Sequence, residues 1–235
     1  MSSGLVLEKA TFRYGELWVL LETSWSVPRG GMAILTGENG GGKSTLLYVC
    51  AGLLPVTSGR VTLDGHAPDV TKPSELVRQG VRRGFVFQHG GLLSNRSALE
   101  NVTLPLSYHA DLLGLESAGV TVRARELLAE LRVSQIDMHA LPAHLSVGVR
   151  QRVALARALA MNPNFVFMDD PDAGLDEATK RLVYERLGRL RDDPNVTTVL
   201  TTTDPELIEY LGAPVMRLEH ARLYRGAATP PDQRA

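Results

Sequence analysis

Short apolar runs separated by turn residues are the main pattern along this chain. They lie at residues 32–35, 85–87, 165–168 and 196–200, each with Gly, Pro, Asn or Asp close by. Runs of this length without alternating polar residues are typical of strands that are buried on both faces, as in a parallel sheet. The pattern therefore predicts at least four buried strands.

Amphipathic stretches with helical spacing lie between these runs. One apolar stripe comprises Leu175, Ala178, Leu182, Val183, Leu187 and Leu190, and another comprises Val122, Leu127, Leu128 and Leu131. Strands that alternate with helices predict an α/β fold.

Two regions depart from this alternation. Residues of about 92 to 145 contain several helical segments and no convincing strand, and the opening thirty residues combine apolar positions with turn signals. We expect a helical insert in the first and an antiparallel β region in the second. The predicted organisation is one domain over 1–226, with a core at 1–91 and about 146–226. A helical subdomain at about 92–160 and a tail at 227–235 complete it.

Composition excludes several function classes. The chain has 235 residues with 25 Lys plus Arg against 26 Asp plus Glu, so no global field draws it to nucleic acid, and we expect no nucleic-acid partner. The single Cys50 excludes an internal disulfide and is expected to be a small buried apolar residue. No signal peptide pattern and no run of about 18 apolar residues occurs, so we expect neither export nor a membrane span.

A glycine-rich segment carries the strongest chemical signal. Gly37-Glu38-Asn39-Gly40-Gly41-Gly42-Lys43-Ser44-Thr45 matches G-x-x-x-x-G-K-[ST] between an apolar strand and an apolar helix. Glycines let successive N–H groups converge on phosphate oxygens, and the helix adds its positive end. We predict that Lys43 reaches the β and γ phosphates of ATP and that Ser44 binds Mg²⁺. The predicted nucleotide-binding residues here are Gly37, Asn39, Gly40, Gly41, Gly42, Lys43, Ser44 and Thr45.

A second candidate site, formed by two carboxylates, follows the apolar run at 165–168. Asp169 and Asp170 come directly after it. In open α/β sheets, ligands bind at the carboxyl ends of strands. Asp169 is therefore the predicted partner of Mg²⁺.

With both motifs in place, the sequence resembles the nucleotide-binding subunit of an ATP-binding cassette (ABC) transporter over about residues 5 to 226. The implied fold is a P-loop NTPase (RecA-like) parallel sheet with an antiparallel β region and a helical insert. By this resemblance Tyr14 stacks on adenine, and Gln88 touches Mg²⁺ and the attacking water. Leu145 to Arg152 occupies the position of the LSGGQ signature, and Ala173 to Asp176 matches the D-loop.

The resemblance also implies partners. Two such subunits pack head to tail, so that Ser146 and Gly148 of one meet the γ-phosphate held by the other, with Asp176 at the same interface. The second subunit is another copy or a homologous ATPase, and both drive transmembrane permease subunits. The expected location is the cytoplasmic face of the inner (plasma) membrane, peripheral through that partner.

Three departures from the family pattern concern hydrolysis. The general base is normally Glu, whereas Asp170 is shorter by one carbon–carbon bond, about 1.5 Å. The switch histidine is replaced by Thr203, which can hydrogen-bond but cannot carry charge. The signature has Val147 and Val149 where the family has Gly and Gln.

We therefore expect good ATP binding and slow hydrolysis, with Lys43, Gln88, Asp170 and Thr203 as the catalytic set. Two alternatives stay open. In the first, neighbouring residues compensate for the three departures and ATP turnover is ordinary. In the second, the subunit pairs with a different ATPase subunit whose hydrolytic residues are intact.

The sequence leaves several functions open, of which lipid transport is the favoured one. Residues 87–95 and 100–109 resemble bacterial lipid-trafficking cassettes of the Mla/Mce type, which favours phospholipid or other lipid cargo. Cassettes for lipoprotein release, cell division and methionine uptake share part of this sequence, so amino-acid uptake stays open. An ABC protein acting on ribosomes or DNA, and a regulatory ATP-binding protein that dimerises without transport, are the non-transport alternatives.

Overall fold

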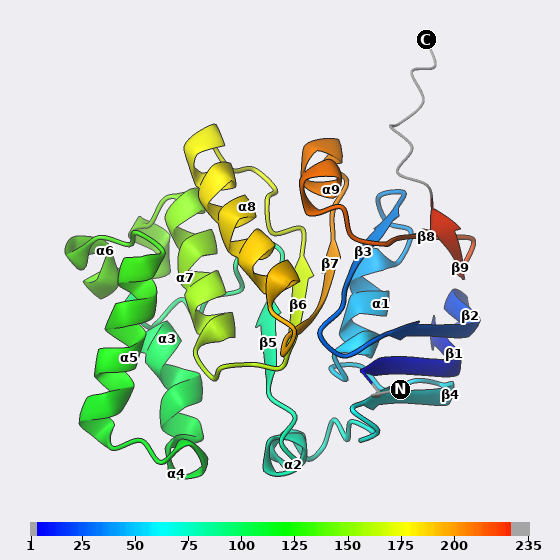
Figure 1. The fold of residues 1–235 in the computed structure, drawn as a ribbon, viewed down its shortest axis with the longest axis horizontal. Helices are drawn as coiled ribbons and strands as arrows, with labels where there is room; N and C mark the ends of the chain where they lie inside the picture. The colour runs from blue at the N-terminus through cyan, green and yellow to red at the C-terminus, as the bar shows by residue number, and fades with distance from the viewer. Residues whose placement is uncertain (1–3, 227–235) are drawn as a thin grey trace. The chain divides into compact units, whose positions relative to one another are not determined.

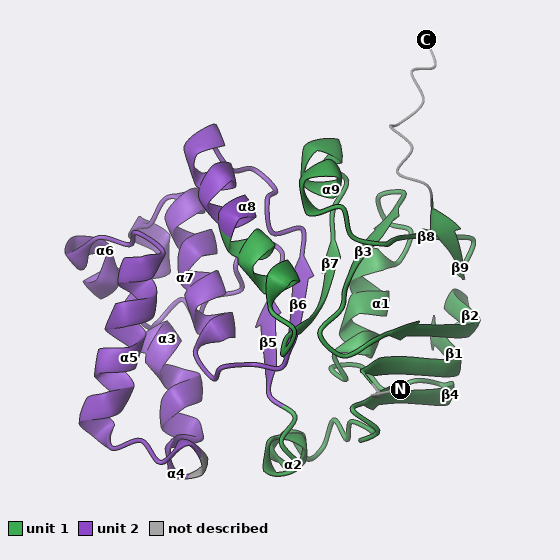
Figure 2. Cartoon of the chain, viewed as in Figure 1, with its two compact units in different colours: residues 1–81, 186–235 green, residues 82–185 purple. Residues whose placement is uncertain are grey.

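Two compact units make up the chain. The computed structural model describes residues 4–226, without the side chain of Leu112, so the predicted tail at 227–235 lies outside the described residues. Figure 1 shows the described chain, and Figure 2 shows its two units: one comprises residues 4–81 with 186–226, and the other comprises Arg82–Glu185. These boundaries differ from the predicted core and helical subdomain, and that division stays a prediction.

The first unit begins with an antiparallel sheet. β1 (Leu5–Tyr14) and β2 (Leu17–Val27) form a hairpin, and β4 (Ser58–Leu63) pairs on the other side of β1. Gly15 supports the turn with a φ of 56°, which glycine adopts without strain. The predicted N-terminal antiparallel region is confirmed, and β4 joins it from outside the opening thirty residues.

A mainly parallel sheet forms the rest of this unit. β3 (Met32–Gly37) lies between β7 (Thr197–Thr201) and β8 (Val215–Glu219) and is parallel to both. β9 (Arg222–Gly226) is antiparallel to β8. All residues of β7 are buried, as the apolar run at 196–200 predicts. The helices of the unit are α1 (Lys43–Cys50), α2 (Pro73–Arg78) and α9 (Pro205–Leu211).

Cys50 ends α1 and is fully buried. Burial disfavours the thiolate and raises the pKa of its thiol. The prediction of a small apolar core residue is confirmed.

The second unit combines two parallel strands with helices. β5 (Arg83–Val86) pairs with β6 (Phe165–Asp169). The segment between them is helical, and α3, α5 and α7 pack against one another (Figure 1). Its helices are α3 (Ala98–Tyr108), α4 (Ala110–Leu113), α5 (Ser117–Glu130), α6 (Gln135–His139), the 3₁₀ helix η1 (Pro142–His144) and α7 (Val147–Leu159). α8 (Glu177–Asp192) begins in this unit and ends in the first.

Two predicted helix faces need correction. Val122 is 55% exposed, and the buried face of α5 is formed by Val120, Ala124, Leu127 and Leu128. Residues 120, 124, 127 and 128 follow the i, i+4, i+7, i+8 spacing of one helix face, whereas residue 122 lies off it. Ala178 is likewise exposed, while Val183 and Leu187 are buried as predicted.

Within residues 4–226, no helix is both long enough and apolar enough to cross a membrane.

The contact between β5 and α7 gives a test of the packing in the second unit. A Cβ on Gly84 would lie 2.2 Å from the backbone oxygen of Ala158, so Gly84→Ala forces the strand away from the helix. We expect the free energy of unfolding to fall by about 1–3 kcal/mol, measured by urea denaturation.

Gly119→Ala in α5 is the matched control. Its Cβ would meet only Leu115 Cδ2 at 3.6 Å, an ordinary contact, and alanine favours a helix over glycine by about 0.5–1 kcal/mol. Equal stability of the two variants would contradict the described packing of β5 on α7.

Candidate functional site

The loop between β3 and α1 has a backbone that only glycine fits at two positions. Gly37 has a φ of 143°, and a Cβ there would lie 2.5 Å from the backbone oxygen of Leu218. Gly42 has a φ of 94°, and its Cβ would lie 2.4 Å from Cγ1 of Val19. β8, beside β3, thus limits one end of the loop, and β2 of the antiparallel sheet limits the other.

Lys43 closes the loop on itself. Its Nζ donates to the carbonyl oxygens of Gly37 and Glu38, each at 2.9 Å, although the residue is only 8% exposed. An ammonium has three N–H donors, so one remains for an anion held by the loop. The charge of Lys43 is therefore fixed at the mouth of the loop.

The start of α1 adds to this positive site. Gly42 is its N-cap and supplies no side-chain hydrogen bond, and among the described residues of the first turn none is acidic. The unpaired N–H groups at a helix start attract anions. Ser44 and Thr45 lie half-buried in that first turn. The start of a helix, an ammonium and a hydroxyl together suit a polyphosphate with Mg²⁺.

Thr203 leaves the sheet at the same edge as the loop. β3 and β7 are parallel, with Leu35 beside Thr201, and the amide of Thr202 donates to the Leu35 carbonyl at 3.2 Å. Thr202 is fully buried, whereas Thr203 is exposed. The residue predicted at the switch position thus has a hydroxyl that a ligand can reach.

Tyr14 ends β1 with much of its ring accessible. It is 52% exposed and packs edge-to-face on Phe12 with ring centroids 4.9 Å apart. Its position leaves a ring face for stacking, and its role toward adenine stays a prediction.

In the second unit, Gln88 and Asp169 lie at the ends of neighbouring strands. β5 and β6 are parallel with Val86 beside Met168, so the segments that follow them leave at one edge. Asp169 is the last residue of β6 and is 2% exposed, whereas Gln88 is exposed in a turn closed by Gly90 N donating to Phe87 O at 2.8 Å. The two predicted Mg²⁺ ligands of this unit are therefore brought to one edge.

Asp170 follows with an unusual backbone. Its φ is 47°, in the left-handed region, and its side chain is half-buried. Asp and Asn adopt this conformation more readily than other residues with a Cβ. The backbone therefore suits the aspartate found here.

The signature segment begins α7. Ser146 is the N-cap, and its Oγ accepts from the amide of Val149 at 3.2 Å. Gly148 is buried, and a Cβ there would lie 2.9 Å from Oγ1 of Thr179. Val147 is 44% exposed, which places an apolar side chain on the surface beside the start of the helix.

Asp176 has a structural role that the sequence prediction did not include. Its carboxylate accepts from the amide of Thr179 at 3.0 Å and from Thr179 Oγ1 at 2.8 Å, which caps the start of α8. The bond from the Thr179 amide lowers the pKa of Asp176. Thr179 thus links the D-loop carboxylate to Gly148, and the Asp-x-x-Thr spacing of a helix cap is the signal that points to it.

Comparisons with known proteins agree with this geometry. The family model for the ABC transporter matches residues 20–173. The taurine import ATP-binding protein TauB of Rhizobium johnstonii is 39% identical over 87% of this chain and 73% of its own length. The lipoprotein-releasing system ATP-binding protein LolD of Bordetella avium is 39% identical over 80% of each chain. Other relatives are longer, and the chain spans 61% of one and 28% of another.

A solved structure supports the same assignment. The ATP-binding cassette MJ0796, a dimer in a post-hydrolysis state bound to ADP and Pi, superposes with a TM-score of 0.84 at 29% identity, covering 94% of this chain and 97% of that one. The predicted P-loop NTPase fold is confirmed. Such subunits bind ATP with Mg²⁺, hydrolyse it and pair with transmembrane permease subunits. From its loop, its fold and these matches, the chain belongs to the ABC transporter family and is one of its ATP-hydrolysing subunits.

Proposed function

We propose that this chain binds ATP at Gly37–Thr45, at the cytoplasmic face of the inner membrane. It uses the binding and hydrolysis of ATP to move separate transmembrane subunits. The observation that carries the proposal is Lys43, whose buried ammonium is held by the carbonyls of Gly37 and Glu38 at the start of α1. Fixed donors around a concave backbone favour phosphate over other anions.

Each predicted site residue has a proposed task. Lys43 and the loop amides hold the β and γ phosphates, and Tyr14 stacks on adenine. Ser44, Gln88 and Asp169 hold Mg²⁺, which neutralises phosphate charge when it is bound. Asp170 accepts a proton from the attacking water, and Thr203 hydrogen-bonds the γ-phosphate. Ser146, Gly148 and Asp176 act on the nucleotide of a second subunit. A dimer is the form in which MJ0796 was solved with ADP and Pi.

Hydrolysis by this subunit is proposed to be slow relative to its binding of ATP. The carboxylate of Asp170 lies about 1.5 Å short of a glutamate's, and displacement of about 1 Å can cost about a hundredfold in rate. Thr203 supplies a hydroxyl without charge. Val147 places a β-branched side chain beside the start of α7, where a partner's phosphate would approach.

For cargo we propose phospholipid or another lipid. Support comes from the resemblance of residues 87–95 and 100–109 to Mla/Mce-type cassettes, and from LolD, a relative named for releasing lipoproteins. TauB is named for taurine import, so family membership does not select the cargo. The neighbouring reading frames test this directly. A multi-spanning permease beside a lipid-binding substrate protein is expected, and a taurine, sulfate or amino-acid binding protein in that place would contradict lipid cargo.

Removal of the Lys43 ammonium tests the ATP site. Lys43→Ala loses a charge-assisted bond to phosphate and the clamp on the loop, so we expect ATP affinity to fall about 10- to 100-fold. Calorimetric titration with Mg²⁺ and ATP measures this. Lys72→Ala, at an exposed lysine before α2, is the control and should bind as the wild type does. Unchanged affinity in Lys43→Ala would refute the site.

Lengthening the carboxylate at position 170 tests the weakened hydrolysis. In the assembled transporter, Asp170→Glu is expected to raise kcat about 10- to 100-fold, because it restores the reach of the base. A steady-state ATPase assay measures kcat. ATP affinity should not change, and calorimetric titration measures it.

Two controls accompany the Asp170 substitution. Asp170→Asn keeps the backbone preference and removes the base, so its kcat should fall below that of the wild type. A thermal melt of Asp170→Glu checks the cost of glutamate at a φ of 47°. A wild type that turns over several times per second, with Asp170→Glu no faster, would show that the site is not weakened.

A further inference from the structure

The segment that follows Gln88 has a backbone that needs outside support. Between β5 and α3, His89, Gly90 and Gly91 have φ values of 61°, 85° and 54°, three left-handed residues in succession. Glycine adopts this conformation freely, but histidine does not. A turn of this kind keeps one shape only where the surrounding structure holds it.

Arg157 supplies that support from the signature helix. On α7, its guanidinium donates from Nη1 to the Gly91 carbonyl at 2.9 Å and from Nη2 to the Gly90 carbonyl at 3.0 Å. Its planar fork fits two adjacent oxygens, and the charge strengthens both bonds. Burial lowers the pKa of Arg157, yet arginine stays charged in proteins.

The turn is also fixed next to Gln88 itself. Gly90, which Arg157 holds by its carbonyl, donates its own amide to Phe87 at 2.8 Å across Gln88 and His89. A Cβ on Gly91 would lie 2.9 Å from Cβ of Phe87, so the chain folds back tightly on the residue before Gln88. Moving the Gly90 carbonyl therefore moves the backbone of Gln88.

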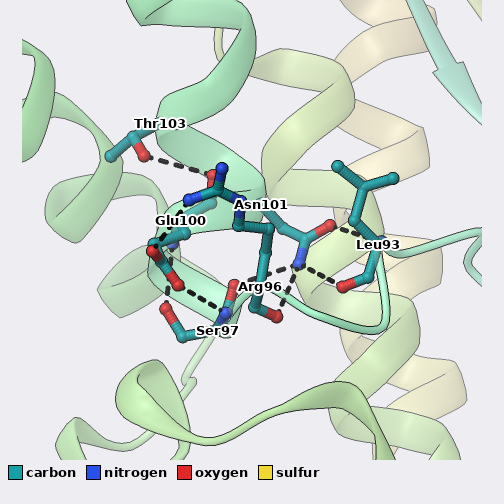
Figure 3. Close-up of polar contacts among 6 residues, drawn as sticks. All are labelled: Leu93, Arg96, Ser97, Glu100, Asn101 and Thr103. Atoms are coloured by element: carbon teal, nitrogen blue, oxygen red, sulfur yellow. Dashed lines mark hydrogen bonds and ion pairs between the residues drawn. The ribbon is translucent and has the colours of Figure 1, made fainter.

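Asn101 anchors the far end of the segment (Figure 3). It is fully buried on α3, and its Oδ1 accepts from the Leu93 amide at 2.8 Å. Its Nδ2 donates to the carbonyls of Leu93, Arg96 and Ser97, at 3.2, 3.1 and 3.0 Å. One amide side chain thus ties the loop to the helix.

A capping box keeps this second anchor rigid. The Ser97 amide donates to Glu100 Oε2 at 2.8 Å, and the Glu100 amide donates to Ser97 Oγ at 3.2 Å (Figure 3). These bonds satisfy amides at the start of α3 and hold the first turn of the helix, which carries Asn101, in place.

We propose that Arg157 is a positioning residue for Gln88, with Asn101 as the second anchor, so that the turn bearing Gln88 moves as one body with α7. The same helix begins at Ser146, so displacement of the signature end is transmitted through Arg157 to Gln88. This inference rests on the proposed function of Gln88 in hydrolysis.

A double-mutant cycle in the assembled transporter tests the inference. Arg157→Met, Gln88→Ala and their combination are compared for kcat, KM for ATP and half-saturating Mg²⁺. Arg157→Met should lower kcat about tenfold and raise the Mg²⁺ requirement, with KM for ATP within about twofold of the wild type, since the phosphate loop is untouched. In the Gln88→Ala background it should cause no further loss, because residues that act through one another are not additive.

Arg191→Met is the matched control. Arg191 also donates to two backbone carbonyls, those of Tyr210 and Leu211, at 3.1 and 3.3 Å, and all three residues belong to the first unit. It should leave kcat unchanged. Arg157→Lys keeps the charge without the fork and should lower kcat about threefold, again only where Gln88 is present, which keeps the test open if Arg157→Met does not fold.

The outcomes separate the two proposals. Additive losses in the double variant, or an Arg157→Met that behaves as Arg191→Met does, would overturn the positioning role while Gln88 keeps its own. A Gln88→Ala variant with wild-type kcat would overturn the function proposed for Gln88, and the positioning role with it.

Discussion

The bond pair between the Lys43 ammonium and the carbonyls of Gly37 and Glu38 is the contact on which the site depends. It holds a positive charge in a nearly buried place and gives the loop one shape. Such a charge is stable there only because both carbonyls point at it. β8 limits the loop at Gly37, and β2 limits it at Gly42 through Val19, so the surrounding strands are arranged around this contact.

The groups assigned to hydrolysis depend on contacts other than those that fix the binding loop. Gln88 lies in a turn, Asp170 directly follows β6, and Ser146 caps the start of α7. Arg157 holds the turn after Gln88, and Thr179 links Asp176 to Gly148. We propose that changes in these contacts lower the rate of hydrolysis without disturbing the loop that binds phosphate, so that binding stays intact while turnover weakens.

Much of the fold follows from the sequence, because buried strands and the phosphate loop have local signatures. The runs at 32–35 and 165–168 became β3 and β6. Gly37, Gly40 and Gly42 have the positive φ angles that favour glycine in such a loop. The predicted face of α5 was wrong at Val122, because the prediction left out Val120 and Ala124, which lie on the buried face. β4 joined the N-terminal sheet through pairing with β1, a contact between segments distant in the chain.

The supporting residues of the site could not be found from sequence alone. Arg157 and Asn101 look like any arginine and asparagine on amphipathic helices, and only the folded chain brings them to backbone carbonyls. The left-handed backbone of Asp170 could not be predicted from the sequence either, although this conformation suits aspartate better than glutamate. Local patterns predict groups that bind, whereas groups that position others emerge from tertiary packing.

A single-turnover experiment tests most directly whether binding is intact and hydrolysis weak. The assembled transporter is mixed in excess with γ-labelled ATP and Mg²⁺, and bound ATP and released phosphate are followed on the same sample. The account predicts that nearly all ATP binds at once and stays unhydrolysed for many seconds. Phosphate release that keeps pace with binding, or ATP that fails to bind, would contradict it.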